Sequence, residues 1–273
     1  MLGDINIMNK QWTKELEVAK QVAVEAGRAI MEIYNSEDFG VEHKADDSPL
    51  TKADKESNRI IVDALRKNFP EYAILSEEEK DNKERLNNPY CFVVDPLDGT
   101  KEFIKRNGQF TVNIALAENG KSIMGVIYVP ATGELYYASE GNGAYLQSGE
   151  IVQKLQVSDK IADIRVVMSS SHGCKEMDAL IAKYQLKNYV KMGSSLKGCV
   201  IAKGDAEVYY RYNPTMEWDT AAMQCIVEEA GGIFRQMDDT PMRYNREDNR
   251  NSKGFYIINS EKNKMSCDTE EEV

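Results

Sequence analysis

The segment 91–102 places two carboxylates three positions apart directly after an apolar run. The apolar residues 91–94 predict a buried strand, and Pro96, which lacks an N–H and fixes φ, predicts that the chain leaves the sheet there. Asp95 and Asp98 would then lie together at a strand end, which is the usual position of a ligand in α/β sheets. Two carboxylates beside the free N–H groups of a helix start could bind divalent cations and a phosphate.

The residues that follow this carboxylate pair favour the start of a helix. Gly99 permits a close backbone approach or a positive φ. Thr100 suits a helix N-cap, with the helix beginning at Lys101. Glu102, like Glu79, is expected to face solvent.

Glu77 and Asp219 occur in the same kind of sequence context as that carboxylate pair. Each comes directly after an apolar stretch or at a predicted helix boundary. Any one of these acids alone could instead be a solvated loop residue or a helix cap. Asp219 in particular could simply complement the dipole of its helix. The pair after the apolar run is harder to explain in this way, because a strand end rarely needs two charges.

Apolar periodicity predicts two helices ahead of the acidic segments. Apolar residues at alternating spacings of three and four predict an amphipathic helix over 16–33. Thr51 can cap a second helix, with Asp54 at the return position of a capping box and Pro70 just past the helix end. The apolar residues 72–75 then predict a short strand that leads directly into the first acidic segment.

The rest of the chain predicts a meander followed by alternating strands and helices. The strands of the meander are joined at turn signals and cover 111–117, 123–129 and 135–139. In the second half, strands are expected at 164–168, 189–192 and 208–212, and helices are expected to end near 184, 202 and 231.

This order of elements predicts a mixed α/β (α+β) fold with layered sheets and helices, in two subdomains that meet at a cleft. Residues 10–150 would form an N-terminal α+β subdomain with the metal site, and residues 151–262 a C-terminal α/β subdomain for the substrate. The polar and acidic segment 263–273 is expected to be disordered.

Composition excludes several classes of protein. The formal net charge of −11 over 273 residues argues against a general binder of nucleic acid or membrane surfaces. Five scattered cysteines without a CxxC pair indicate reduced thiols in a cytoplasmic protein rather than disulfides or structural zinc. No apolar run reaches transmembrane length, and no signal peptide is evident. With only two histidines, any bound metal should be hard and oxygen-ligated.

Two polar loops could bind anions. The loop 169–172 contains Ser171 and His172 but lacks a GxSxG elbow and an evident third member of a triad, so we expect a phosphate-binding or plain polar loop. Residues 193–197 (GSSLK) have the pattern of a loop that leads into a helix N-terminus, an anion site in principle, although helix starts are common.

Four motifs together resemble one known family. In order and spacing they span about residues 14–260, and they are 50–54 (LTKAD), 74–78 (ILSEE), 94–100 (VDPLDGT) and 218–222 (WDTAA). On these motifs the chain resembles the lithium-sensitive, magnesium-dependent phosphatases related to inositol monophosphatase. The segments 101–108 (KEFIKRNG) and 193–197 (GSSLK) are similar to the bacterial 3′(2′),5′-bisphosphate nucleotidase branch. Inositol monophosphatases typically have an uncharged residue and an Asn where Lys101 and Glu102 stand here.

The resemblance implies a fold and a metal site. The fold would be a layered α/β/α/β/α sandwich with two or three Mg²⁺ ions between its halves. The first ion would be held by Glu77, Asp95 and the Leu97 carbonyl. The second would be held by Asp95, Asp98 and Asp219, so that Asp95 bridges the two ions. Carboxylates without histidine suit Mg²⁺, which takes oxygen ligands.

The resemblance also implies a reaction and a substrate. Asp54 and Thr100 would orient and deprotonate the attacking water. The substrate would be adenosine 3′,5′-bisphosphate, hydrolysed to AMP and phosphate, with 3′-phosphoadenylyl sulfate of sulfur metabolism as a further candidate. It would contact the site residues Glu77, Leu97, Asp98, Gly99, Thr100 and Asp219. Candidates for a cationic pocket that holds the remaining 5′-phosphate are Ser171, His172, Lys175, Ser194, Ser195, Lys197 and Arg211.

Two other functions stay open on the same scaffold. One is an inositol or sugar monophosphatase. The other is a sensor that binds metal and nucleotide without turnover, although the presence of Asp54 and Thr100 argues against it. The expected partner is a small nucleotide bisphosphate and not nucleic acid. The expected location is the cytoplasm without stable membrane insertion, with a peripheral position at the inner membrane as an alternative, and the sequence leaves the oligomeric state undecided.

Overall fold

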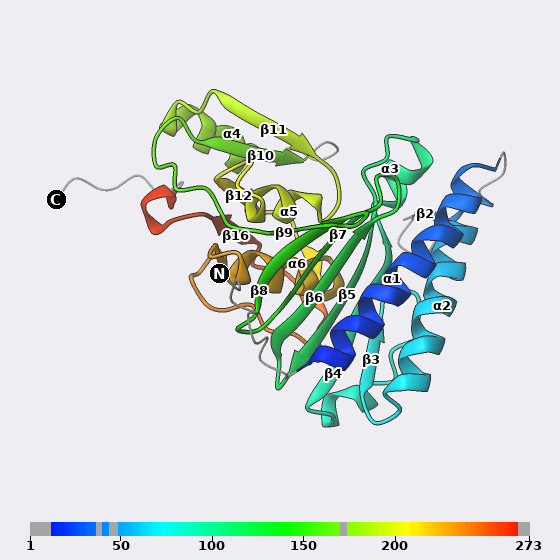
Figure 1. Cartoon of the computed structure of the whole chain (residues 1–273). Helices are drawn as coiled ribbons and strands as arrows, with labels where there is room; N and C mark the ends of the chain where they lie inside the picture. The colour runs from blue at the N-terminus through cyan, green and yellow to red at the C-terminus, as the bar shows by residue number, and fades with distance from the viewer. Residues whose placement is uncertain (1–11, 37–39, 44–48, 170–173, 267–273) are drawn as a thin grey trace, which may run out of the picture.

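The computed structural model of the protein describes residues 12–36, 40–43, 49–169 and 174–266. Its elements are stacked in five layers, namely a helix pair, a seven-stranded sheet, a second helix pair, a five-stranded sheet and an outer helix (Figure 1). The predicted mixed α/β class is therefore confirmed, and so is the layered sandwich that the family resemblance implies.

The first helical layer consists of α1 and α2, which lie side by side on one face of the large sheet (Figure 1). α1 spans Thr13–Tyr34 and buries the predicted apolar stripe against the sheet. α2 spans Lys52–Asn68 and begins with the predicted capping box, in which Asp54 accepts the Thr51 N–H. The other α-helices of the described residues are α3 Thr100–Ile104, α4 Lys175–Tyr184, α5 Leu196–Ala202 and α6 Glu217–Glu229.

The seven-stranded sheet has the strand order β3-β4-β5-β6-β7-β8-β9. β3 runs parallel to β4, and from β4 onward each strand is antiparallel to the next, as in the predicted meander. The turn at 141–143 does not end the meander, which continues through β8 and β9, two strands that the sequence pattern did not predict. The bounds are β3 Ala73–Ser76, β4 Tyr90–Asp98, β5 Thr111–Glu118, β6 Lys121–Val129, β7 Glu134–Ser139, β8 Gly143–Ser148 and β9 Ile151–Lys154.

β4 corrects one prediction about the acidic segment. The strand does not end at Pro96, because Asp98 still pairs with Thr111 of β5. The pairing register shifts between Asp95 and Asp98, so Pro96 lies in a bulge, a position that tolerates a residue without an N–H. Residues three apart on a regular strand point to opposite faces, and a bulge re-aims them. The bulge thus allows the two carboxylates to share one side of the sheet.

The five-stranded sheet has the order β11-β10-β12-β16-β14. β10 is parallel to β11 and β12, whereas β16 is antiparallel to β12 and β14. β14 and β16 were not predicted from the sequence pattern. The bounds are β10 Arg165–Ser169, β11 Asn188–Met192, β12 Val208–Arg211, β14 Ile233–Gln236 and β16 Phe255–Ile258. The short pairs and 3₁₀ helices are β1 Glu42–His43 with β2 Pro49–Leu50, β13 Thr215–Met216 with β15 Arg250–Asn251, η1 Glu84–Asn87 and η2 Glu261–Asn263.

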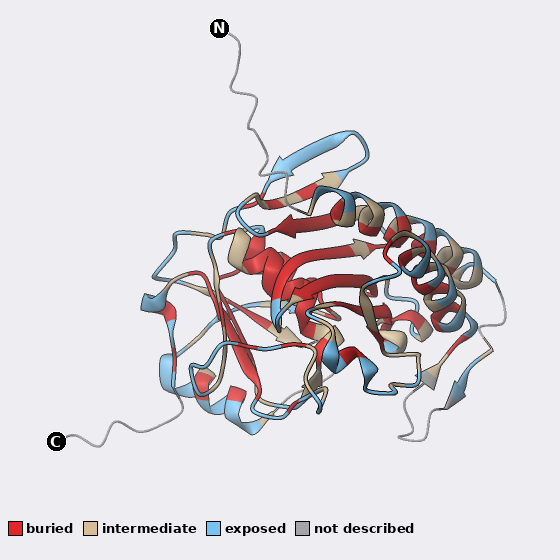
Figure 2. Cartoon of the chain, turned by 90° about the horizontal axis from the view of Figure 1, so that it is seen from below, coloured by how far each residue is buried: buried red, intermediate tan, exposed pale blue. Residues whose placement is uncertain are grey.

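α6 is mostly buried and lies between the two sheets, where the buried residues of the interior concentrate (Figure 2). It packs across β4 to β8 of the large sheet and against α5 and β14. Gly125 of β6 permits this contact, because a Cβ there would lie 2.3 Å from the Ala222 carbonyl oxygen. The second half of the sequence therefore packs directly on the sheet of the first half.

The C-terminal segment is ordered further than predicted. Asn263 and Met265 are buried, and the Met265 N–H donates to the Tyr210 hydroxyl at 2.6 Å. The predicted disorder is wrong for residues 263–266, because the Met265 side chain packs in the apolar cluster between α4 and the five-stranded sheet. Residues 267–273 lie outside the described residues.

Two further observations concern the helices and the cysteines of the described residues. Within them, none of the helices combines the length and the apolar character that a membrane crossing requires. The described cysteines form no disulfide and are Cys91, Cys174, Cys199 and Cys225. Burial raises the pKa of the Cys91 thiol to about 12, so this thiol stays protonated at neutral pH.

We expect Gly125→Ala to destabilise the protein by about 1–3 kcal/mol, because the added methyl would separate β6 from α6. Urea unfolding monitored by circular dichroism measures this change. Ser148→Ala on the exposed end of β8 is the control and should change the free energy of unfolding by less than about 0.5 kcal/mol. Equal stability of the Gly125→Ala variant and the unmodified protein would contradict the packing described here.

Candidate active site

A cleft of about 340 Å³ is lined by residues from both halves of the chain. Its acidic lining residues are Glu77, Asp98, Glu102 and Asp219, and its basic lining residues are Lys101, Lys197 and Arg211. A cleft with both signs of charge can hold an anionic ligand once a cation offsets the carboxylates.

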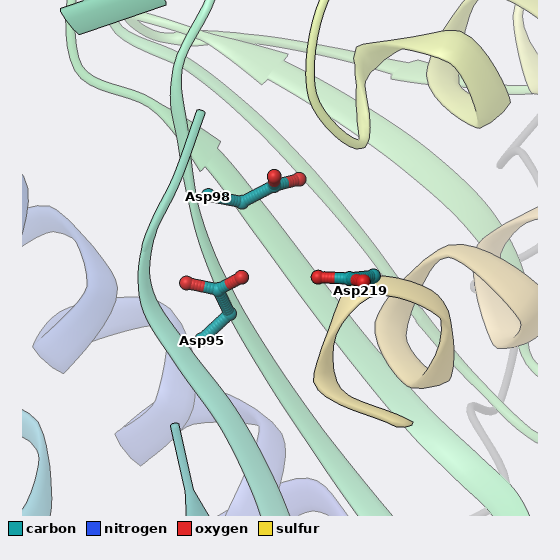
Figure 3. A group of neighbouring side chains, drawn as sticks. All are labelled: Asp95, Asp98 and Asp219. Atoms are coloured by element: carbon teal, nitrogen blue, oxygen red, sulfur yellow. The ribbon is translucent and has the colours of Figure 1, made fainter. Parts of the chain in front are cut away.

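Asp95, Asp98 and Asp219 point toward one another beside this cleft (Figure 3). Their carboxylate groups each offer an oxygen, and these oxygens all lie within 4.8 Å of one another. The first two come from either side of the bulge in β4, and the third comes from the first turn of α6. The structure thus brings together three of the predicted metal ligands, from segments far apart in the sequence.

Burial and mutual repulsion oppose the ionisation of this group. Burial, and then the charges of Glu77 and Asp98, raise the pKa of Asp95 well above its usual range. Burial and the charge of Asp98 raise the pKa of Asp219 to about 8, although the Met216 N–H, which donates to its Oδ2 at 2.7 Å, acts in the opposite direction. Carboxylates this close suit a divalent cation, which would replace the repulsion by attraction. The residues present therefore fit a Mg²⁺ site.

Asp98 is held in a fixed orientation. Its Oδ2 accepts hydrogen bonds from the Ser194 hydroxyl at 2.8 Å, from the Ser195 hydroxyl at 2.7 Å and from the Ser195 N–H at 2.7 Å. The Asn113 side-chain amide lies 3.4 Å from the same oxygen. Since all these donors from the described residues reach Oδ2, the other oxygen, Oδ1, stays available to a cation.

Glu77 and Leu97 lie next to the group of three aspartates. Glu77 follows β3, its N–H donates to the Val94 carbonyl at 3.1 Å, and its half-buried side chain lines the cleft. Leu97 lies within the bulge, where its N–H donates to Asp95 Oδ1 at 3.1 Å. The resemblance implies that both residues are metal ligands, and these roles stay predictions.

The Thr100 hydroxyl donates to Asp54 Oδ1 at 3.0 Å. Asp54 is buried, and its Oδ2 accepts the N–H and the hydroxyl of Thr51 at 2.7 and 2.5 Å. The predicted N-cap role of Thr100 is wrong, because Gly99, with a φ of 92°, is the N-cap and Thr100 is the first residue of α3. Its hydroxyl is therefore directed to Asp54 rather than to the helix backbone.

The residues predicted to hold a second phosphate fall into three sets. Those that line the cleft are Ser194, Ser195, Lys197 and Arg211. Lys175 is exposed at the start of α4 and does not belong to that lining. Ser171 and His172 lie outside the described residues.

Lys197 lies at the start of α5, and its ammonium group is affected by burial and by neighbouring charges. Burial lowers its pKa, the charge of Asp98 raises it, and the charge of Arg211 lowers it further. Its Nζ donates to the Ser194 carbonyl and lies 5.8 Å from the centroid of the Tyr209 ring. Two neighbouring cations in the lining of a cleft provide a favourable environment for a phosphate group.

Three residues of the site were not anticipated. Glu102 was expected to face solvent, but its side chain is only 6% exposed and lines the cleft, so that prediction is wrong. It packs against Gly193, where a Cβ would lie 2.9 Å from Glu102 Cγ. Asn113 and Tyr209 are buried as well. A sequence signal for Asn113 did exist, namely a side-chain amide between the apolar residues of β5. A buried amide needs polar partners, so its position indicates a polar contact inside the protein.

The fold and the site define a class of metal-dependent phosphatases, and the chain belongs to the inositol monophosphatase family, whose sequence model matches residues 11–266. Enzymes of this family depend on Mg²⁺, in agreement with the acidic group described above. The resemblance drawn from the four motifs is thereby confirmed.

Among characterised relatives, the chain is similar to the 3′(2′),5′-bisphosphate nucleotidase CysQ of Escherichia coli K12. The two are 39% identical over 244 residues, which cover 89% of this chain and 98% of that protein. The CysQ of Buchnera aphidicola is 43% identical over 227 residues, which cover 82% of this chain and 85% of that protein.

A solved structure supports the same relationship. The crystal structure of CysQ from Bacteroides thetaiotaomicron, a bacterial member of the inositol monophosphatase family, superposes with a TM-score of 0.82 at 41% identity. The alignment covers 93% of this chain and all of that one, 100%. The suhB protein of Bartonella henselae gives a TM-score of 0.77 at 26% identity, over 90% of this chain and 94% of that one.

Without Mg²⁺, we expect the melting temperature to fall as the pH rises from about 5 to 8. An unfolded aspartate ionises near pH 3.9, whereas Asp219 in the folded chain has a pKa of about 8. Across this window the folded state holds more protons than the unfolded state, so its stability decreases with rising pH. Calorimetry in EDTA at a series of pH values measures the slope.

Two comparisons check the cause of this slope. Asp219→Asn removes one titrating group and should flatten the dependence. Excess Mg²⁺ should raise the melting temperature most at the highest pH, because metal binding requires deprotonated ligands. A melting temperature in EDTA that increases steadily over the same range would contradict the repulsion described here.

Proposed function

We propose that this protein is a Mg²⁺-dependent phosphoric monoester hydrolase, a 3′(2′),5′-bisphosphate nucleotidase that converts adenosine 3′,5′-bisphosphate to AMP and phosphate. The observation that carries the proposal is the group of Asp95, Asp98 and Asp219 beside a cleft that also contains Thr100 and Lys197. The CysQ relatives at 39% and 43% identity support the substrate class. 3′-Phosphoadenylyl sulfate, which carries the same 3′-phosphate, is a second candidate substrate.

The proposed metal ligands are those that the resemblance implies, and two or three Mg²⁺ ions would bind. Glu77, Asp95 and the Leu97 carbonyl would hold one ion. Asp95, Asp98 and Asp219 would hold another. When bound, such ions lower the pKa of a bound water and neutralise charge on the attacking and leaving oxygens.

Asp54 is proposed as the base that acts through Thr100. The Thr100 hydroxyl donates to Asp54 Oδ1, so its oxygen can accept a hydrogen bond from the attacking water and orient it. The second oxygen of Asp54 is occupied by Thr51, which prevents the carboxylate from rotating. The water proton would pass by way of Thr100 to Asp54 as the water oxygen bonds to phosphorus and the bond to the 3′-oxygen breaks. The departing 3′-oxygen would take up a proton from solvent, and Asp54 would release its proton to solvent.

Specificity for a bisphosphate is proposed to come from the basic part of the cleft. Lys197 and Arg211 would bind the 5′-phosphate, with Lys101 of the cleft lining as a further positive charge. Ser171, His172 and Lys175 belong to the same prediction. A monophosphate has no group to satisfy these cations, so the bisphosphate should bind more tightly.

The proposal includes a division of the chain into a metal-site subdomain at 10–150 and a substrate subdomain at 151–262. The aspartates of β4 belong to the first and the aspartate of α6 to the second. The cleft between them is therefore complete only when both parts are folded.

A phosphate-release assay with Mg²⁺ tests the function. The panel contains adenosine 3′,5′-bisphosphate, its 2′,5′ isomer, inositol 1-phosphate and fructose 1,6-bisphosphate, and the first should have the highest kcat/KM. A higher kcat/KM for inositol 1-phosphate would establish the alternative, an inositol or sugar monophosphatase. Tight binding of the bisphosphate without phosphate release would instead indicate a sensor.

Asp98→Asn should lower kcat by roughly 10²–10³-fold, the scale seen when one group that stabilises developing charge is lost. The fold should persist, because removing one of three repelling charges does not create a cavity. Steady-state kinetics and the melting temperature check the two statements. The matched control is Asp205→Asn, an exposed position next to α5 that should keep full activity. Near-normal turnover of the Asp98→Asn variant at ordinary Mg²⁺ concentration would contradict the proposed ligand.

Lys197→Ala should raise KM for adenosine 3′,5′-bisphosphate by about 10–100-fold, which corresponds to the binding free energy of one or two charge-assisted hydrogen bonds. The KM for adenosine 3′-monophosphate should change much less, because that substrate lacks the 5′-phosphate. Lys203→Ala at the other end of α5 is the control and should leave both constants unchanged. Equal losses on both substrates would show that Lys197 does not recognise the second phosphate.

A further inference from the structure

Ser195 connects the two aspartates that come from opposite halves of the chain. Its hydroxyl lies 2.7 Å from Asp98 Oδ2 and 3.1 Å from the Asp219 carbonyl oxygen. Its N–H also donates to Asp98 Oδ2 at 2.7 Å. The residue is only 1% exposed, so these contacts are shielded from water. One buried serine thus contacts both the bulged strand β4 and the first turn of α6.

Asn113 of β5 determines which way the Ser195 hydroxyl donates. The side-chain amide of Asn113 donates to Ser195 Oγ at 2.9 Å, and its carbonyl oxygen accepts from the Thr111 hydroxyl at 2.9 Å. The amide therefore occupies a lone pair of the serine oxygen, and the single hydroxyl proton is directed to the acceptors around it. Those acceptors are the Asp98 carboxylate and the Asp219 carbonyl.

We infer that Ser195, oriented by Asn113, is a positioning residue for the metal site rather than a contact for the substrate phosphate. Both groups direct donors to the Oδ2 side of Asp98, which leaves Oδ1 without these donors. The inference rests on the proposed metal ligands. It assigns to Ser195 a role different from the phosphate pocket suggested by the sequence motif 193–197.

The geometry favours this role for two reasons. The single proton of the Ser195 hydroxyl is already directed to two acceptors, Asp98 Oδ2 and the Asp219 carbonyl oxygen, while Asn113 donates to the hydroxyl oxygen. A phosphate would have to displace the carboxylate from this donor. Partners that orient metal ligands typically change metal affinity by about 10–100-fold when removed, without touching the metal.

Ser195→Ala should therefore weaken Mg²⁺ binding by about 10-fold. Isothermal titration of Mg²⁺ into the metal-free protein, without substrate, measures the apparent Kd. At saturating Mg²⁺, the KM for adenosine 3′,5′-bisphosphate should change by less than about threefold, because the substrate contacts are intact. Asn113→Ala should also weaken Mg²⁺ binding. The loss of binding free energy in the double variant should be smaller than the sum of the two single losses, since both residues act on one carboxylate oxygen.

Ser139→Ala is the matched control, because Ser139 is an equally buried serine that accepts from Asn142 on the large sheet, outside the cleft lining. It should leave the Kd of Mg²⁺ unchanged, and the melting temperature in EDTA shows that each variant is folded. An unchanged Kd with a raised KM in the Ser195→Ala variant would make Ser195 a substrate contact and overturn the inference. Equal weakening by Ser195→Ala and Ser139→Ala would overturn it as well.

Asp98→Asn separates this inference from the proposed function. If that variant loses Mg²⁺ binding while Ser195→Ala does not, the metal site stands and only the positioning role fails. If Asp98→Asn binds Mg²⁺ as tightly as the unmodified protein, the proposed ligand itself is refuted.

Discussion

The repulsion among three neighbouring carboxylates, of which Asp95 is buried and Asp98 and Asp219 are half-buried, is the interaction on which the rest of this structure depends. The oxygens of Asp95, Asp98 and Asp219 lie within 4.8 Å of one another, and burial together with their mutual charge raises the pKa of the first and the last. Such a group is unfavourable unless protons or cations compensate it. The surrounding layers supply the packing energy that keeps the carboxylates together before a cation binds.

Asp54 and Asp219 each use one carboxylate oxygen to accept a backbone N–H at the start of a helix. Asp54 accepts the Thr51 N–H with Oδ2 and the Thr100 hydroxyl with Oδ1. Asp219 accepts the Met216 N–H with Oδ2 at the corresponding position of α6. Both acids are therefore capping-box residues, and a helix cap holds a carboxylate with little freedom to rotate. The same contact stabilises the helix and orients the functional group.

The start of α6 is anchored by a second buried charge cluster. Glu217 is fully buried, accepts the N–H groups of Asn245 and Arg246, and forms an ion pair with the Arg246 side chain at 3.0 Å. Arg85 of η1 is also buried and donates to the Asn245 side chain. This contact links the segment that contains Asn245 and Arg246 to the connection before β4. Breaking a buried pair of this kind leaves an uncompensated buried charge, so a displacement of α6 from this position is unfavourable.

Local patterns in the sequence determined the helices, most of the meander, the capping box of α2 and the identity of the acidic residues, because these depend on neighbours along the chain. The motifs also determined the family. Only the tertiary structure decided that the β4 bulge brings Asp95 and Asp98 to one side, that Glu102 is buried, and that Ser195 contacts Asp98. These features arise from pairing and packing between distant segments, whose register and close approach no local pattern encodes.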